Sequence, residues 1–332
     1  MTRIADGALY RGASVFLFLS VALFIEHWSI LTDWRTAPAT MALVTLPIAA
    51  LVARFVQSWR GLGRLIRRGA PPPPPAPPPG LRVAMITTFV PHAEPIEMLE
   101  STLVAMRAVR YPHHCWVLDE GDDPAVRDLC VRLGVRHYTR KGRAALNLAT
   151  GPLARATKYG NVNAWLTEIG YDAYDVVSAF DPDHVPAPAF LERTLGYFDA
   201  PDVALVQAAQ VYYNAPASLV ARGAAEESDA YYAFVLPAAF ATGYIVAVGC
   251  HNTHRVAALR AVGGFADHDA DDVLLGLRYL AAGWRGVYVP ETLAIGLTPV
   301  DWAAYLTQQR RWARSMYDIK LRRLGSLWSR LP

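Results

Sequence analysis

The sequence predicts an α/β fold with a mostly parallel sheet and helices on both faces, between an N-terminal transmembrane helical hairpin and a C-terminal amphipathic interfacial helix. Three observations predict this arrangement. Two long apolar runs lie close to the N-terminus. From residue 82 onward, short apolar strands alternate with segments of helical periodicity, a pattern typical of parallel sheets. Aromatic and basic residues are interleaved over residues 301–332, as in helices that lie on a membrane surface.

The composition agrees with a membrane-embedded part. The chain has 332 residues and is 53% hydrophobic, which is high for a soluble enzyme. A net charge of +3 is too small to indicate nucleic-acid binding, so no nucleic-acid partner is expected. The cysteines Cys115, Cys130 and Cys250 form no CxxC pair, which argues against a disulfide framework or a zinc ribbon and suits a reducing compartment.

The apolar runs cover residues 13–32 and 37–56. Each is long enough to cross a bilayer, since about 20 apolar residues are needed. The first run contains Glu26 and His27, which we expect near an interface or against the partner helix because charge deep in lipid is costly. A cleaved signal peptide is the alternative for the first run. It is disfavoured because no small-residue cleavage site follows and a second apolar run does.

The flanking charges predict the orientation. The loop between the runs holds only Asp33 and Arg35, whereas five arginines lie at the end of the second run or after it: Arg54, Arg60, Arg64, Arg67 and Arg68. The positive-inside tendency places this cluster and the rest of the chain in the cytoplasm, so we expect a multi-pass protein of the cell membrane. The cluster is either a solvated face or a contact for anionic headgroups, and its position favours the headgroups.

Composition also divides the chain. Residues 1–69 form the hairpin with its basic flank. Residues 70–80 form a linker, because the run PPPPPAPPP at 71–79 favours extended polyproline II. Residues 81–300 form the α/β domain, and residues 301–332 form the interfacial helix.

Within the α/β domain, strands are predicted at 82–88, 115–119, 135–138, 175–183 and 203–207, and helices at 95–108, 124–134, 158–170 and from Asp271 onward. In such sheets, ligands bind at the carboxyl ends of the strands. Two strands end in acid, at Asp119 and at Asp181 with Asp183. A nucleotide and a metal are therefore expected at this edge.

The pair Asp181 and Asp183 offers oxygen ligands on alternate residues. Mg²⁺ or Mn²⁺ accepts such ligands and bridges substrate phosphates. Acidic pairs in turns are common, so this motif is a weak signal by itself. The adjacent His184 is either a further ligand or a hydrogen-bond donor.

The other candidate functional residues could each have an ordinary structural role instead. Asp119 could accept hydrogen bonds from a base or ribose, or could be an ordinary loop acid. Lys158 opens a helix and could pair with a diphosphate, or could simply be exposed. A carboxylate at Asp271 or Asp272 could be only a helix cap. Gln308, Arg311 and Trp312 fall on one helical face, where a Trp commonly fills a core or an interface.

The order of these motifs carries a resemblance. The chain reads Asp-Glu-Gly at 119–121, Lys-Tyr-Gly-Asn at 158–161, Asp-Pro-Asp at 181–183, Ala-Asp-Asp at 270–272 and Gln-Gln-Arg-Arg-Trp at 308–312. Over 82–318 it resembles the processive branch of family 2 glycosyltransferases, the cellulose-synthase-like and hyaluronan-synthase-like enzymes, whose motifs run D-D-G, K-A-G-N, D-x-D, T-E-D and Q-x-x-R-W. Flanking segments 92–103, 206–214 and 263–272 are also similar. Glu120, Ala270 and Asp271 depart from the pattern.

The resemblance implies a GT-A-type domain that transfers a hexosyl unit, with inversion, from a nucleotide-sugar to a carbohydrate acceptor. The donor would be a UDP-sugar, and the cofactor Mg²⁺ or Mn²⁺ on Asp181 and Asp183. Asp272 would be the catalytic base. The donor-binding residues would be Thr87, Glu94, Asp119, Lys158, Asp181 and Arg311. The acceptor-binding residues would be Gln308, Trp312, Cys250 and His251.

Several alternatives stay open. Polymer-secreting members continue into further transmembrane helices after the Q-x-x-R-W motif, which leaves processivity open. A non-processive transferase acting on a lipid or short glycan, and an inactive nucleotide-sugar-binding subunit of a synthase, are the competing functions. The partners expected are a glycan or glycolipid acceptor, membrane lipid and further membrane subunits. A glycoside hydrolase is disfavoured, since it would need neither Lys158 nor the acidic motif. A zinc site of His251, His254 and His268 is not adopted, because scattered loop histidines are usually not ligands.

Overall fold

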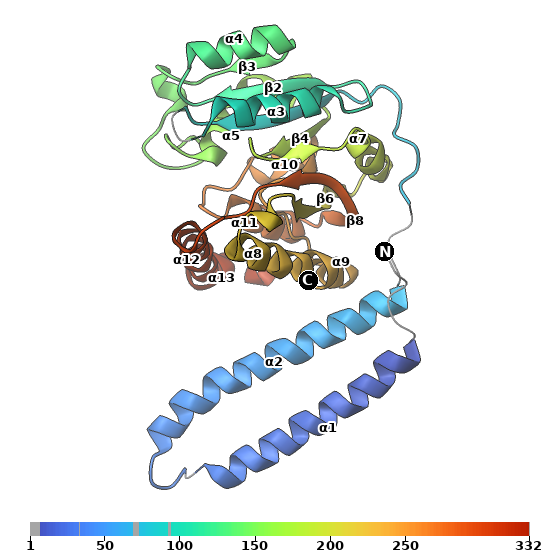
Figure 1. Ribbon diagram of the computed structural model, residues 1–332, viewed down its shortest axis with the longest axis vertical. Coiled ribbons are helices and arrows are strands. Elements are labelled where there is room, and N and C mark those ends of the chain that lie inside the picture. The colour runs from blue at the N-terminus through green and yellow to red at the C-terminus, as the bar shows by residue number, and fades with distance from the viewer. Residues whose placement is uncertain (1–6, 33, 69–72, 92–93, 332) are drawn as a thin grey trace.

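The computed structural model describes residues 7–331 except 33, 69–72 and 92–93. The predicted linker at 70–80 and the similar segment at 92–103 therefore fall partly outside the described residues. The described chain forms a helical hairpin below an α/β domain (Figure 1).

The α/β domain is built on one eight-stranded sheet in the order β3-β2-β1-β4-β7-β6-β8-β5. Neighbours β3, β2, β1 and β4 run parallel, as do β6 and β8, whereas β7 is antiparallel to both β4 and β6 and β5 is antiparallel to β8. The strands are β1 Val83–Phe89, β2 His114–Asp119, β3 Arg136–Tyr138, β4 Val176–Phe180, β5 Val185–Pro186, β6 Val203–Tyr212, β7 Asn252–Arg255 and β8 Arg285–Gly296.

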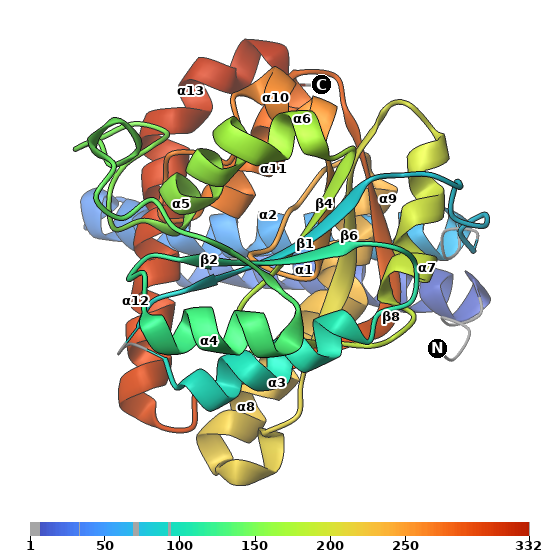
Figure 2. The same ribbon diagram turned by 90° about the horizontal axis from the view of Figure 1, so that it is seen from above.

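Helices cover both faces of the sheet (Figure 2). Successive side chains of a strand point to opposite faces of the sheet. In β1, Ala84 and Ile86 belong to one buried apolar cluster and Val83 and Met85 to the other, so both faces need a cover of helices. The helices of the first cluster are α5 Lys158–Trp165, α10 Val256–Val262 and α11 Asp271–Ala281, with α6 Tyr171–Ala173 beside them; those of the second are α3 Ile96–Arg107, α4 Pro124–Leu133 and α7 Phe190–Thr194. The predicted α/β fold, mostly parallel with helices on both faces, is confirmed.

The hairpin consists of α1 Gly7–Leu31 and α2 Pro38–Arg68. Both helices are apolar and long enough to cross a membrane, with a mean hydropathy of 1.9 and no buried residue in their most apolar windows. They are joined by a Trp28 Nε1–H bond to Thr45 Oγ1 (3.0 Å) and by stacking of Tyr10 on Trp59 with 5.3 Å between ring centroids.

The hairpin contacts the α/β domain through the C-terminal part of α2. It packs on α9 Leu236–Ala241, which follows α8 Leu219–Ala230 and a π-helical turn. At the contact, a Cβ added to Gly61 would lie 3.0 Å from Ala238 Cβ, so the two backbones approach closely. In turn, α9 packs against β8.

Several predicted boundaries differ. The helix α2 continues to Arg68, so the arginine cluster lies on the helix instead of following it. The strand β4 ends at Phe180, which leaves Asp181 and Asp183 in the turn after it. Strands β5, β7 and β8 and helices α8 and α9 have no counterpart in the sequence prediction, because their pairing depends on distant partners.

The C-terminal segment is helical, as α12 Trp302–Asp318, a π-helical turn at 319–323 and α13 Leu324–Leu327. Asp301 caps α12 by accepting a hydrogen bond from the Ala304 backbone N–H at 2.8 Å. Large apolar side chains stay exposed along it: Trp302, Leu306, Trp312, Tyr317, Leu321 and Trp328.

Candidate active site

The acidic turn after β4 lies at the carboxyl edge of the sheet. Thr102 Oγ1 donates a hydrogen bond to the Pro182 carbonyl (2.7 Å), which fixes the turn against α3. Asp181 forms an ion pair with Lys158, at the start of α5. Lys158 Nζ also donates to the Gly249 carbonyl at 3.0 Å. A strand end, a helix start and the loop before β7 therefore converge on one ammonium group.

Charge in this cluster is balanced by pairing. Burial alone would lower the pKa of Lys158, but the carboxylates of Asp181 and Asp271 raise it above its ordinary value. Burial opposes ionisation of Asp181, yet the Lys158 ammonium lowers the pKa of that carboxyl. Burial and the nearby Asp181 raise the pKa of Asp183, although His184 and Lys158 oppose that effect. A further positive charge at this turn would relieve the repulsion between the two carboxylates.

The turn offers a plausible donor set for a hard cation. The ligand atoms of Asp181, Asp183 and His184 all lie within 4.8 Å of one another. Both carboxylates are about a third exposed, at 32% and 28% of the side chain, so they are open to substrate. Carboxylate oxygens with one imidazole fit Mg²⁺ or Mn²⁺.

Asp271 and Asp272 form the first turn of α11. Burial, together with the neighbouring Asp272, raises the pKa of Asp271 to about 7. Burial also raises the pKa of Asp272, an effect opposed by the backbone N–H groups of Val273 and Gly249 and by Lys158. The same loop residue, Gly249, thus contacts Lys158 through its carbonyl and stabilises the Asp272 carboxylate through its amide. The structure brings the predicted base close to the predicted phosphate-binding lysine.

Asp119, at the end of β2, is completely buried. Its carboxylate accepts hydrogen bonds from the backbone N–H groups of Gly121 (2.9 Å) and Asp123 (2.6 Å) and contacts His137 Nε2 at 3.1 Å. These contacts shape the loop after β2, a role that the sequence motif did not indicate.

Glu120 reaches a partner that the sequence analysis missed. Its carboxylate accepts two hydrogen bonds from Arg140, at 2.9 and 3.0 Å. Arg140 is fully buried and also donates to the carbonyls of Leu146, Ala154 and Thr157. The guanidinium therefore fixes the long connection that leads into α5 and positions Lys158. A buried charge requires such compensation, and an arginine after a predicted strand gives little sign of it.

The remaining donor candidates lie around this core. Thr87, on β1, is fully buried, and its Oγ1 has no hydrogen-bond partner among the described residues. Glu94 accepts a hydrogen bond from the Val90 backbone N–H at 3.3 Å. Burial raises the pKa of Glu94, and the charges of Asp181 and Asp183 add to that effect. The Glu94 carboxylate therefore lies near enough to Asp181 and Asp183 for their charges to affect it.

The predicted acceptor residues, together with the predicted donor residue Arg311, divide into two groups. Cys250 and His251 are buried, with 1% and 0% exposure, behind the acidic turn. Gln308, Arg311 and Trp312 lie on α12, where Trp312 is 45% exposed. In the part of the chain that the structure describes, no hydrogen bond or ion pair joins Arg311 to the acidic cluster. The structure thus assembles the loop and strand-end residues, whereas the residues of α12 stay outside this hydrogen-bonded cluster.

Comparison with known proteins shows what this chain is similar to. Residues 176–331 match the model of the glycosyl transferase family group 2. The chain is 26% identical over 244 residues to the cellulose synthase catalytic subunit [UDP-forming] of Xanthomonas axonopodis pv. citri, covering 70% of this chain and 32% of that protein. It is 29% identical over 209 residues to glucomannan 4-beta-mannosyltransferase 1 of Oryza sativa subsp. japonica, covering 59% and 38%. Residues 176–331 therefore resemble family 2 glycosyltransferases, and the relatives are of the cellulose-synthase-like type.

The fold of the α/β domain is also similar to that of a solved structure. A mannosyltransferase from Pyrobaculum calidifontis, solved in complex with GDP-Man and Mn²⁺, superposes with a TM-score of 0.60 at 18% identity and covers 82% of this chain and 72% of that one. The family match begins at β4 and includes the acidic turn, Asp272 and the Q-x-x-R-W motif, whereas Asp119 and Lys158 precede it. The aligned stretches span only about a third of the two curated relatives.

Gly160, in the first turn of α5, tests how the α/β domain positions Lys158. A Cβ at Gly160 would lie 2.1 Å from the Ala154 carbonyl oxygen and 2.8 Å from Arg140 Nη1. Gly160→Ala should therefore destabilise the domain by about 1–3 kcal/mol, as overpacking does, and weaken nucleotide-sugar binding. Thermal unfolding and donor titration of the detergent-solubilised protein would measure both.

Gly223 provides the matched control. It lies in α8, and a Cβ there would meet nothing within 4 Å. Gly223→Ala should be neutral or stabilise the helix by roughly 0.5–1 kcal/mol. Equal stability of the two variants would show that the close approach of Arg140 and α5 does not exist in solution.

Proposed function

We propose that this chain is a membrane-bound, inverting glycosyltransferase that transfers a hexosyl unit from a nucleotide-sugar, a UDP-sugar by family, to a carbohydrate acceptor in the manner of a polysaccharide synthase. One observation carries the proposal. Lys158 lies between the acidic turn at Asp181 and the loop residue Gly249, which in turn adjoins Asp272. A diphosphate-binding cation and a base therefore meet at the carboxyl edge of the sheet, where α/β folds bind ligands.

Asp181 and Asp183, with His184 beside them, would hold Mg²⁺ or Mn²⁺. The similarity to a UDP-forming cellulose synthase subunit supports a nucleotide-sugar donor, and the Pyrobaculum mannosyltransferase was solved in complex with GDP-Man and Mn²⁺. When bound, the cation would neutralise the charge that develops on the leaving diphosphate. Lys158 would bind the same diphosphate from the other side, where its ammonium stays protonated because the carboxylates around it raise its pKa.

Asp272 would remove the proton from the acceptor hydroxyl as its oxygen attacks the anomeric carbon, while the diphosphate leaves with the bonding electrons. One base without an enzyme nucleophile implies a single displacement and hence inversion. From α12, Arg311 would bind phosphate oxygens, since a guanidinium can do so bidentately. Trp312 would form a platform for the acceptor sugar, because its ring is nearly half exposed on α12.

The two apolar helices support a membrane location. The arginines of α2 and the exposed aromatic residues of α12 would contact headgroups at the cytoplasmic surface. In this arrangement the acceptor side of the site faces the bilayer, which suits a lipid-linked or membrane-extruded product.

The metal role predicts that excess chelator abolishes sugar transfer and that Mn²⁺ or Mg²⁺ restores it. Release of nucleoside diphosphate by the solubilised protein would measure the effect. Asp183→Asn should remain inactive after metal is added back, because the variant lacks a ligand. Undiminished transfer in excess chelator would exclude the metal role.

The base assignment predicts that Asp272→Asn retains donor affinity while transfer falls by a factor on the order of 100 or more. Asp271→Asn should cost far less. The wild-type rate should fall as the pH drops through about 7, because the raised pKa of Asp271 leaves the carboxylate pair sharing a proton below that value. In Asp271→Asn this acid limb should move to lower pH.

The control for the base prediction is donor binding by both variants at neutral pH. Near wild-type transfer by Asp272→Asn, or complete loss in Asp271→Asn, would reassign the base to the first carboxylate.

The membrane proposal predicts that the protein stays with membranes after a high-salt wash and is released by detergent. A tag placed after Pro79 should be accessible only from the cytoplasmic side. Deletion of residues 1–68 should weaken but not abolish membrane association, since α12 still presents apolar side chains. Intact full-length chain in the wash supernatant would contradict the proposal.

A further inference from the structure

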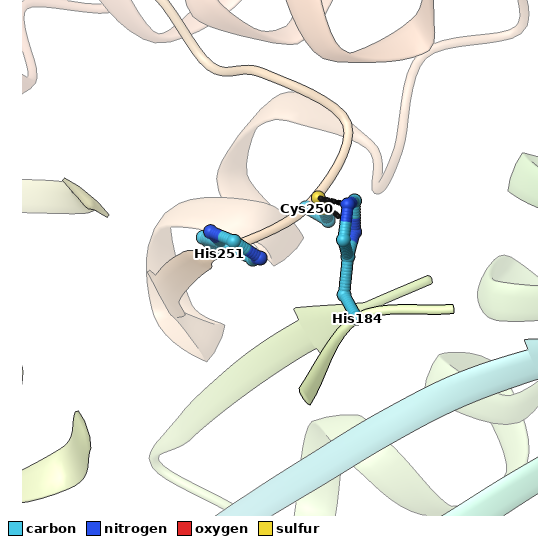
Figure 3. Close-up of side chains that lie close together, drawn as sticks. All are labelled: His184, Cys250 and His251. Carbon is cyan, nitrogen blue, oxygen red and sulfur yellow. Dashed lines mark hydrogen bonds between the residues drawn. The ribbon is translucent and has the colours of Figure 1, made fainter. Parts of the chain in front are cut away.

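A second group of potential metal ligands lies directly behind the acidic turn. His184, Cys250 and His251 offer three ligand atoms within 4.8 Å of one another. All three residues are buried, with 5%, 1% and 0% exposure. Figure 3 shows the His184 ring beside the sulfur of Cys250, with His251 next along the same loop. This group differs from the zinc site of His251, His254 and His268 that the sequence analysis weighed.

His251 has one ring nitrogen free for a ligand. Its Nδ1 lies 3.0 Å from the Ala209 carbonyl oxygen and therefore carries the proton. Its Nε2 is buried and has no hydrogen-bond partner among the described residues. Metal-binding histidines have this arrangement, with one nitrogen donating to a carbonyl and the other presenting its lone pair.

The backbone at His251 is also unusual. Its φ of 56° lies in the left-handed region, which non-glycine residues adopt infrequently and which functional sites enrich. By contrast, His254 on the following strand is a satisfied core residue: its nitrogens contact Tyr279 Oη at 3.1 Å and Asn252 Oδ1 at 3.0 Å. A histidine buried in this core can thus have partners for both ring nitrogens, so the unpartnered Nε2 of His251 is not explained by burial alone.

Cys250 supplies a sulfur that faces nitrogen donors. Its Sγ lies 2.7 Å from His184 Nδ1 and 2.8 Å from Gln210 Nε2. A thiol–imidazole contact would account for Cys250 and His184 but not for the free nitrogen of His251. Cys115 and Cys130 are likewise buried and free, yet neither belongs to a group of ligand atoms in the described chain.

We propose that His184, Cys250 and His251 form a binding site for a thiophilic divalent cation, Zn²⁺ being the physiological candidate. A thiolate with two imidazoles is a donor set that prefers such ions over Mg²⁺. Binding exchanges the Cys250 thiol proton, released to solvent, for a sulfur–metal bond. Three protein ligands would leave one position of a tetrahedral ion open. The carboxylates of Asp181 and Asp183 lie nearby, each 3.9 Å from His184 Nδ1.

The experiment uses metal-stripped full-length protein in detergent micelles, titrated with Co²⁺ and then with Zn²⁺. A sulfur-to-cobalt charge-transfer band in the near ultraviolet should appear with one equivalent of Co²⁺, and Zn²⁺ should displace it. Neither donor nor acceptor is present, so the outcome is independent of the proposed transferase activity.

Two variants remove ligands by different means. Cys250→Ser should abolish the band. His251→Gly should weaken Zn²⁺ binding by at least the roughly 10- to 100-fold that loss of an outer-shell partner costs. Glycine accepts the left-handed backbone, so this variant introduces no backbone strain, and it tests the site independently of Cys250→Ser.

The matched controls are Cys130→Ser, which removes another buried thiol, and Asp183→Asn, which removes a carboxylate of the acidic turn. Both should retain the band. Its absence from the wild type, its persistence in Cys250→Ser, its loss in Cys130→Ser, or unchanged Zn²⁺ affinity of His251→Gly would each overturn the site.

Discussion

The ion pair between Lys158 and Asp181 is the interaction on which the site depends. It joins the start of α5 to the turn after β4, and the Lys158 bond to Gly249 adds the loop that leads to β7. A partly buried ammonium without these partners would be costly, and the acids around it would lose the charge that keeps them ionised. One cation therefore determines both the arrangement of three chain segments and the charge state of the cluster.

Support for that cation comes from a second buried charge. Arg140 binds Glu120 and three carbonyls of the connection before α5. The glutamate that replaces an aspartate in the family pattern is thus part of a matched pair, and its carboxylate is occupied by a protein partner. The change from aspartate to glutamate can therefore preserve the site, because the longer Glu120 side chain binds Arg140.

The acidic turn has two different chemical surroundings. Toward solvent lie the carboxylates of Asp181 and Asp183, which suit hard cations. Toward the interior lie the sulfur of Cys250 and the free imidazole nitrogen of His251, and His184 belongs to both groups. The metal preference of the turn thus depends on which side of one histidine an ion occupies.

The sequence by itself determined the α/β fold, the apolar hairpin and the residues that meet at the sheet edge, because hydrophobic periodicity and the order of short motifs are local properties of the chain. It could not determine the three strands β5, β7 and β8, the continuation of α2 through its arginines, or the burial of Asp119. Only the tertiary structure decided that Glu120 binds Arg140 and that Cys250, His251 and His184 converge. Those contacts join residues up to 67 positions apart (251 − 184), and long-range packing, which no local pattern encodes, brings them together.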